Sequence, residues 1–89
     1  MYTIYKYELE VTDKQVFEMP YGAKPLSVDT QNGHPCMWVQ VNTNTKMFKY
    51  EVVIVGTGHP LPNMMNLKYV GTFKMYNDKL IYHVYFQPV

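Results

Sequence analysis

Apolar and polar residues alternate with a period of two along much of this chain, the pattern of β-strands with one buried face. The pattern predicts strands over residues 2–11, 15–19, 26–30, 36–41, 48–55, 69–76 and 79–87. The side chains expected to face the core are Tyr5, Tyr7, Leu9 and Val11; Leu26 and Val28; Met37, Val39 and Val41; Phe48, Tyr50, Val52 and Ile54; and Leu80, Tyr82, Val84 and Phe86. Sustained 3.6-residue periodicity is absent from the sequence, and residues 63–67 are predicted to form one short helical turn.

Short turn sequences separate these strands. Asn32-Gly33 and Asn77-Asp78 are typical of two-residue hairpin loops, whereas residues 56–66 form a longer loop. Short strands at roughly ten-residue spacing indicate an all-β fold. We therefore predict a single domain over residues 1–89, a small antiparallel sandwich or partly open barrel of about six to seven short strands. In a meander, the loops at 31–35 and 56–63 would share one end of the fold.

Composition narrows the class of protein. Nine tyrosines, seven methionines, four phenylalanines and one tryptophan are a large apolar content for 89 residues, and a single cysteine cannot form an internal disulfide. We therefore expect a homo-oligomer. The net charge of +1 argues against binding to duplex nucleic acid, and the sequence predicts neither a membrane span nor a signal peptide. A cytoplasmic location is the expectation.

The tripeptide Gly-His-Pro occurs twice, at 33–35 and at 58–60. The second copy lies in a glycine- and proline-rich loop, whose backbone amides and stiffness suit anion binding. Its alternative interpretation is an ordinary surface turn. All eight basic residues are lysines, so bidentate arginine clamps on phosphate are excluded. The candidate ligand-binding residues are Gly56, Thr57, Gly58, His59 and Asn63 of this loop, together with Gln31, Asn32, Trp38 and Lys24.

Catalytic and metal chemistry find little support in the sequence. The three histidines lie in separate segments, so we predict no metal site and no cofactor. Cys36 begins a strand beside Trp38 and is expected to act as a small buried hydrophobe. The acidic residues are scattered, and no nucleophile motif surrounds Ser27. We therefore predict that the protein is not an enzyme. The alternative is a small histidine-dependent phosphodiesterase.

Several segments together carry a resemblance. Residues 19–28, 31–38 (QNGHPCMW), 56–62 (GTGHPLP) and 69–72, with Tyr82-His83-Val84 near the end, resemble a family of small bacteriophage and prophage proteins of unassigned function. The resemblance covers nearly the whole chain and implies a viral origin and action in the cytoplasm of a bacterial host. It assigns no catalytic residue.

Two functions follow from that context. The first is a sponge, a binding module that sequesters a nucleotide-derived immune signal without catalysis and so inhibits antiphage defence. Phosphates and a stacked base would then contact the glycine loop, lysine and aromatic residues. The alternative is a phage structural, assembly or inhibitory protein that acts through protein–protein contact.

Overall fold

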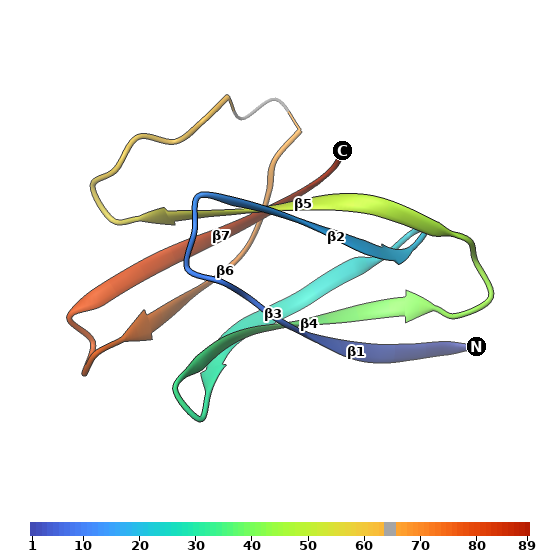
Figure 1. The fold of residues 1–89 in the computed structure, drawn as a ribbon, viewed down its shortest axis with the longest axis horizontal. Helices are drawn as coiled ribbons and strands as arrows, with labels where there is room; N and C mark the ends of the chain where they lie inside the picture. The colour runs from blue at the N-terminus through green and yellow to red at the C-terminus, as the bar shows by residue number, and fades with distance from the viewer. Residues whose placement is uncertain (64–65) are drawn as a thin grey trace.

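Seven β-strands make up most of the computed structural model, which describes residues 1–63 and 66–89 (Figure 1). In chain order the strands are β1 (Tyr2–Glu8), β2 (Lys14–Pro20), β3 (Lys24–Gln31), β4 (His34–Asn42), β5 (Met47–Gly56), β6 (Lys68–Met75) and β7 (Leu80–Pro88). The strands agree closely with those that the alternation predicts. The predicted helical turn at 63–67 includes residues 64 and 65, which lie outside the described residues.

The strands form two antiparallel sheets. Sheet A has the order β1-β4-β3, and sheet B has the order β2-β5-β7-β6. The predicted all-β antiparallel sandwich is therefore confirmed. The sheets do not close into a barrel, because no backbone ladder among the described residues joins one sheet to the other. The molecule is flat, with extents of 40 × 31 × 16 Å.

The core lies between the two sheets, where alternate residues of each strand meet. Met37, Val39 and Val41 of β4 are completely buried, as their spacing predicts. Sheet B contributes Tyr50, Val52 and Ile54 from β5, together with further buried residues, namely Met19, Phe73, Val84 and Phe86. Cys36 is buried, in agreement with its predicted role as a small hydrophobe.

Four residues predicted to lie in the core are exposed instead, namely Val11, Leu26, Tyr5 and Leu80. Val11 is 47% exposed, because β1 ends at Glu8 and the chain then leaves the sheet. Leu26 is exposed although Val28 is buried. The reason is a β-bulge between Pro25 and Ser27, which breaks the period-two alternation that would have put Leu26 and Val28 on one face.

The two-residue hairpin turn predicted at Asn32-Gly33 is confirmed, whereas the one predicted at Asn77-Asp78 is wrong in length, because Met75 pairs with Leu80 and leaves the four-residue loop 76–79. Gln31 pairs with His34 across Asn32 and Gly33, whose φ values of 52° and 81° match a type I′ turn. Within that loop the Lys79 N–H donates to the Tyr76 carbonyl at 3.2 Å, and Tyr76, Asn77 and Asp78 all have positive φ.

The loops at 31–35 and 56–63 lie toward the same end of the fold (Figure 1). The Leu9 N–H donates to the Pro35 carbonyl beside the first loop, and the Ile54 N–H donates to the Asp13 carbonyl beside the second. The short connection from Leu9 to Asp13 thus links the two loop regions.

The two long sides of the sandwich differ. On one side β3 and β6 approach so closely that a Cβ added at Gly71 would lie 2.8 Å from Val28 Cγ2 and 3.6 Å from the Val28 backbone nitrogen. Only glycine at position 71 allows this approach without displacing Val28. On the other side, β1 and β2 are the outer strands of their sheets.

Replacing Gly71 with alanine should therefore lower the free energy of unfolding by about 1–3 kcal/mol, since the added methyl group overpacks a stiff β-branched neighbour. Gly56→Ala is the matched control, because its Cβ would meet its nearest neighbours at ordinary contact distances of 3.7–3.8 Å. Chemical denaturation of the two variants checks this. Equal stability of Gly71→Ala and Gly56→Ala would show that the β3–β6 contact is not tight.

Candidate functional site

The residues predicted to bind a ligand lie in separate parts of the fold. Gly56 ends β5, Thr57, Gly58 and His59 follow it directly, and Asn63 lies further along the same loop. Lys24 begins β3 beside a hollow between the two sheets.

The residues predicted to read or stack a base lie elsewhere. Trp38 is on the outer face of sheet A, where its cross-strand partners are Lys6 and Ser27. Gln31 accepts a hydrogen bond of 2.8 Å from Lys6 Nζ, so its amide oxygen is already bound within the chain. Neither these residues nor Asn32 line the hollows described below.

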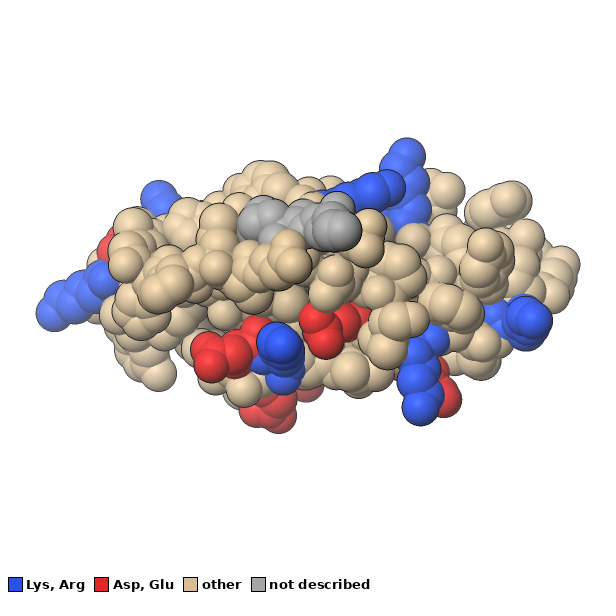
Figure 2. All heavy atoms as spheres, turned by 90° about the horizontal axis from the view of Figure 1, so that it is seen from above, with Lys and Arg blue, Asp and Glu red and all other residues tan. Residues whose placement is uncertain are grey.

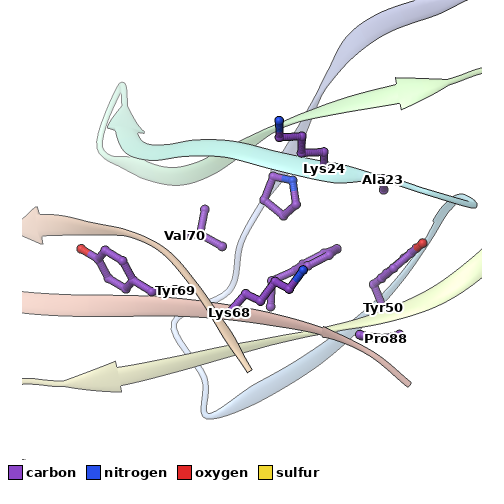
Figure 3. A pocket seen from close by; sticks show the side chains of 9 residues that line it. Ala23, Lys24, Tyr50, Lys68, Tyr69, Val70 and Pro88 are labelled. Carbon is purple, nitrogen blue, oxygen red and sulfur yellow. The ribbon is translucent and has the colours of Figure 1, made fainter. Parts of the chain in front are cut away.

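One hollow, here called the inter-sheet pocket, lies between β3 and β6 and has a volume of about 500 Å³ (Figure 3). This volume is within the range of small-molecule sites. The lining residues on which the argument depends are Lys24 and Pro25 of β3, Lys68 and Val70 of β6, Tyr50 of β5 and Phe86 of β7. The pocket thus draws on both sheets.

Two β-bulges explain why a hollow exists here. β3 is irregular between Pro25 and Ser27, and β6 is irregular between Tyr69 and Gly71. A bulge bends a strand and increases its twist. These irregularities lie just beside the close contact of Gly71 with Val28, so the two facing strands separate immediately next to the point where they touch. The bulge residue Val70 projects into the gap between them (Figure 3).

The floor of the pocket is aromatic and already ordered. The rings of Tyr50 and Phe86 are stacked, with centroids 4.9 Å apart and an interplanar angle of 15°. Both residues are buried. The Gly22 N–H donates to the Tyr50 hydroxyl oxygen at 3.0 Å and fixes the ring from the other end. A ligand entering here would meet a rigid apolar surface.

The charge at the pocket is positive. Its lining contains Lys24 and Lys68 and no acidic residue. Figure 3 shows the Lys68 side chain extending over the pocket, whereas the Lys24 side chain points away from it. Lys68 is exposed, and in the described part of the chain no carboxylate pairs with it. Lys68 is therefore the principal candidate for holding an anionic group, and Lys24 lines the rim.

The predicted glycine loop forms a second region, on the outer face of sheet B. Gly58 has a φ of 88° and allows a tight turn in which the His59 N–H donates to the Gly56 carbonyl at 3.1 Å. His59 and Leu61 line hollows of about 400 and 280 Å³ on either side of the loop. Val53 and Val55 also line these hollows and are buried although they face outward, so the loop covers this part of the sheet.

A chain of hydrogen bonds fastens this loop to the sheet. Thr57 Oγ1 lies 2.8 Å from His83 Nε2, and His83 Nδ1 lies 3.0 Å from Thr72 Oγ1. Thr72 Oγ1 in turn lies 2.6 Å from the Tyr69 hydroxyl. Each ring nitrogen of His83 thus has a hydroxyl partner, which can donate or accept as the tautomer requires. The histidine connects β7, β6 and the loop.

Sequence reasoning missed His83 and Lys68. The predicted inward face of 79–87 places His83 on the outer face, but only the pairing of β6 with β7 brings Thr72 opposite it. Lys68 had no signal, because it is one of several lysines at strand ends.

The pairing of Thr57 with His83 also bears on catalysis. A hydroxyl beside an imidazole is the arrangement of an activated nucleophile, in which a third group orients the base. Here the third group is the Thr72 hydroxyl and not a carboxylate. The pair is the best candidate for the enzyme alternative, and the absence of catalysis stays a prediction.

The described residues offer neither a metal site nor a membrane-spanning helix. These residues contain no group of three or more His, Cys, Asp or Glu side chains placed to hold a metal ion. None of the described segments forms a helix long and apolar enough to span a bilayer. Lysines and acidic residues are interspersed on the face that Figure 2 shows, which is no continuous basic surface.

The structure thus defines a small two-sheet β protein with a positively charged, aromatic pocket at one side of the sandwich. The chain belongs to the family DUF7352, a domain of unknown function whose model matches residues 1–89. No curated protein and no solved structure matches it.

The hydrogen-bonded chain predicts a specific effect of Thr57→Val, which keeps the shape of the side chain and removes the hydroxyl. The loss should cost about 0.5–1.5 kcal/mol of stability and speed amide hydrogen exchange at Gly58 and His59. Thr57→Ser keeps the hydroxyl and is the control. If the amides of Gly58 and His59 exchange at the wild-type rate in both variants, the hydrogen bond between Thr57 and His83 does not hold the loop.

Proposed function

We propose that this protein binds, without catalysis, a small ligand that combines an anionic group with a flat ring, and that it does so in the inter-sheet pocket. The observation that carries the proposal is the combination of the Tyr50–Phe86 floor with the Lys68 ammonium above it, with which no carboxylate of the described residues pairs, in a lining free of acidic residues.

Nucleotides are the ligand class that fits this chemistry best. A base stacked on an aromatic side chain contributes about 1–3 kcal/mol. A lysine acts on phosphate as a point charge, and the chain has no arginine that would clamp it in two places. The site therefore favours a ligand with few phosphates. The preordered floor reduces the entropy that binding would cost.

The resemblance to small phage and prophage proteins extends this proposal. It rests on the motifs at 31–38 and 56–62. In an infected bacterium, a protein of this kind would sequester a nucleotide-derived immune signal in the host cytoplasm. Cyclic dinucleotides, cyclic oligonucleotides and ADP-ribose derivatives are thus the first ligands to test.

Protein contact is the second candidate function. It is favoured by the large apolar side chains that the fold leaves at its surface, among them Tyr2, Tyr21, Met47 and Tyr76, each more than half exposed. Such side chains are enriched in protein interfaces. A phage structural, assembly or inhibitory protein would use them.

The test is a thermal-shift screen of the purified protein against the three ligand classes, with recovery of the ligand after heating. A ligand that binds only the native state raises the melting temperature in a saturable way, by several degrees at about 100 times its Kd. Recovery of the unchanged ligand supports binding without catalysis, and an altered ligand would point to the enzyme alternative.

Substitutions then locate the site. Lys68→Ala should weaken binding by about 10- to 100-fold, because it removes a charge-assisted hydrogen bond, and Lys24→Ala should weaken it less. Lys49→Ala is the matched control, since Lys49 is an exposed lysine of β5 outside the pocket. The proposed site is wrong if Lys68→Ala and Lys49→Ala bind equally well, and protein contact takes its place if no ligand shifts the melting temperature.

A further inference from the structure

The outer strand of sheet A, β1, has a backbone edge that is open to another strand. β1 pairs with β4 on one side only. Its residues Tyr2, Ile4, Lys6 and Glu8 are all exposed. The segment contains no proline and its ladder with β4 has no bulge, the two backbone features that commonly blunt the edge of a sheet.

The hydrogen-bond pattern identifies the groups on this edge. The Leu9 N–H donates to the Pro35 carbonyl, and the Thr43 N–H donates to the Met1 carbonyl. In an antiparallel pair every second residue bonds to the same neighbour, so the odd-numbered residues of β1 bond to β4. The N–H and C=O groups of Tyr2, Ile4, Lys6 and Glu8 therefore point to the free edge.

The outer strand of sheet B, β2, is protected where β1 is not. By the same pattern its odd-numbered residues bond to β5, since the Asp13 carbonyl accepts from the Ile54 N–H and the Tyr21 N–H donates to the Lys46 carbonyl. The free edge of β2 thus includes Pro20, which has no N–H to donate. Of the two outer strands on this side, β1 offers the complete edge.

The inner face of β1 is also incompletely covered. Tyr5 faces inward with Tyr7, as does Val39 of β4, and is nevertheless 42% exposed. It begins an aromatic row in which the rings of Tyr5 and Tyr7 are 6.4 Å apart and those of Tyr7 and Phe17 are 5.5 Å apart. Burial, with a smaller contribution from Tyr5, raises the pKa of the Tyr7 hydroxyl. Tyr5, the last ring of this row, is therefore in contact with solvent.

We propose that β1 is a dimerisation strand, on which a second copy of this chain pairs its own β1 antiparallel about a two-fold axis at Tyr5. The edge groups belong to even-numbered residues, so even-numbered residues of one copy must pair with even-numbered residues of the other. The midpoint of such a pair is a whole residue number, and the two-fold axis therefore passes beside one residue and its own copy. The Tyr5 axis is the one that pairs all of Tyr2–Glu8 with itself, joining Tyr2 to Glu8 of the second copy and Ile4 to its Lys6.

Charge and packing favour this register over its neighbours. An axis at Lys6 would place two lysines directly opposite each other, which is destabilising. An axis at Ile4 would leave Glu8 without a partner. The Tyr5 axis places no like charges opposite each other and brings the two exposed Tyr5 rings together, so each aromatic row continues into the other. The inter-sheet pocket, between β3 and β6, remains open in such a dimer.

Sedimentation of the full chain over a concentration series tests the proposal. The wild-type protein should reach twice the 10.5 kDa mass of the chain. Ile4→Pro removes an edge N–H without removing a bond to β4, and should raise the dimer Kd by at least about 10-fold. Val16→Pro is the matched control, since Val16 has the same position on the edge of β2, and it should leave the dimer unchanged.

A second pair of variants tests the register without altering the backbone. Ile4→Glu places a carboxylate opposite Lys6 of the second copy, and Ile4→Lys places a lysine there, at both symmetry-related positions. The Kd of Ile4→Lys should exceed that of Ile4→Glu by about 10-fold. The proposal is overturned if the wild-type protein stays monomeric throughout the concentration series. It is equally overturned if Ile4→Pro leaves the dimer unaffected, or if the two Ile4 variants have equal dimer Kd values. These outcomes are independent of whether the pocket binds a nucleotide.

Discussion

The close approach of β3 to β6 is the contact on which the rest of the structure depends. Gly71 lets the backbone of β6 lie directly against Val28, where a Cβ would come within 2.8 Å of the valine side chain. No backbone ladder joins the two sheets across this contact in the described chain, so packing alone closes this side of the sandwich. The core between the sheets is small, and closing one side removes much of its apolar surface from water.

The pocket follows from the same contact. Two strands that touch at Gly71 and Val28 and carry bulges at adjacent positions must separate beside that point. The separation opens a hollow above the buried, stacked rings of Tyr50 and Phe86 and places Lys68 at its mouth. On the opposite side the ring of Tyr7 meets that of Phe17, and β1 and β2 end their sheets there without a further strand. One side of the sandwich thus suits a small ligand and the other suits a second strand.

Most of the fold could be predicted from the sequence, because strands with one buried face show a period of two and type I′ turns need residues such as Asn32-Gly33. Leu26 was misplaced because a bulge leaves no clear signal in a single sequence. The site was predicted only in part. Lys24 and the Gly56–His59 loop do lie beside hollows, but Lys68 and His83 become significant through contacts between strands, which the sequence does not specify.

The most direct test of the account is to titrate isotope-labelled protein with ADP-ribose and follow its backbone amide resonances. The account predicts saturable shifts centred on Ala23, Lys68, Val70 and Phe86, around the inter-sheet pocket, with the resonances of Gly58 and His59 little changed. Shifts centred on Gly58 and His59 instead would move the site to the glycine loop and contradict the central role given to the pocket. If neither region responds to ADP-ribose or to the cyclic nucleotides, the pocket is not a nucleotide site.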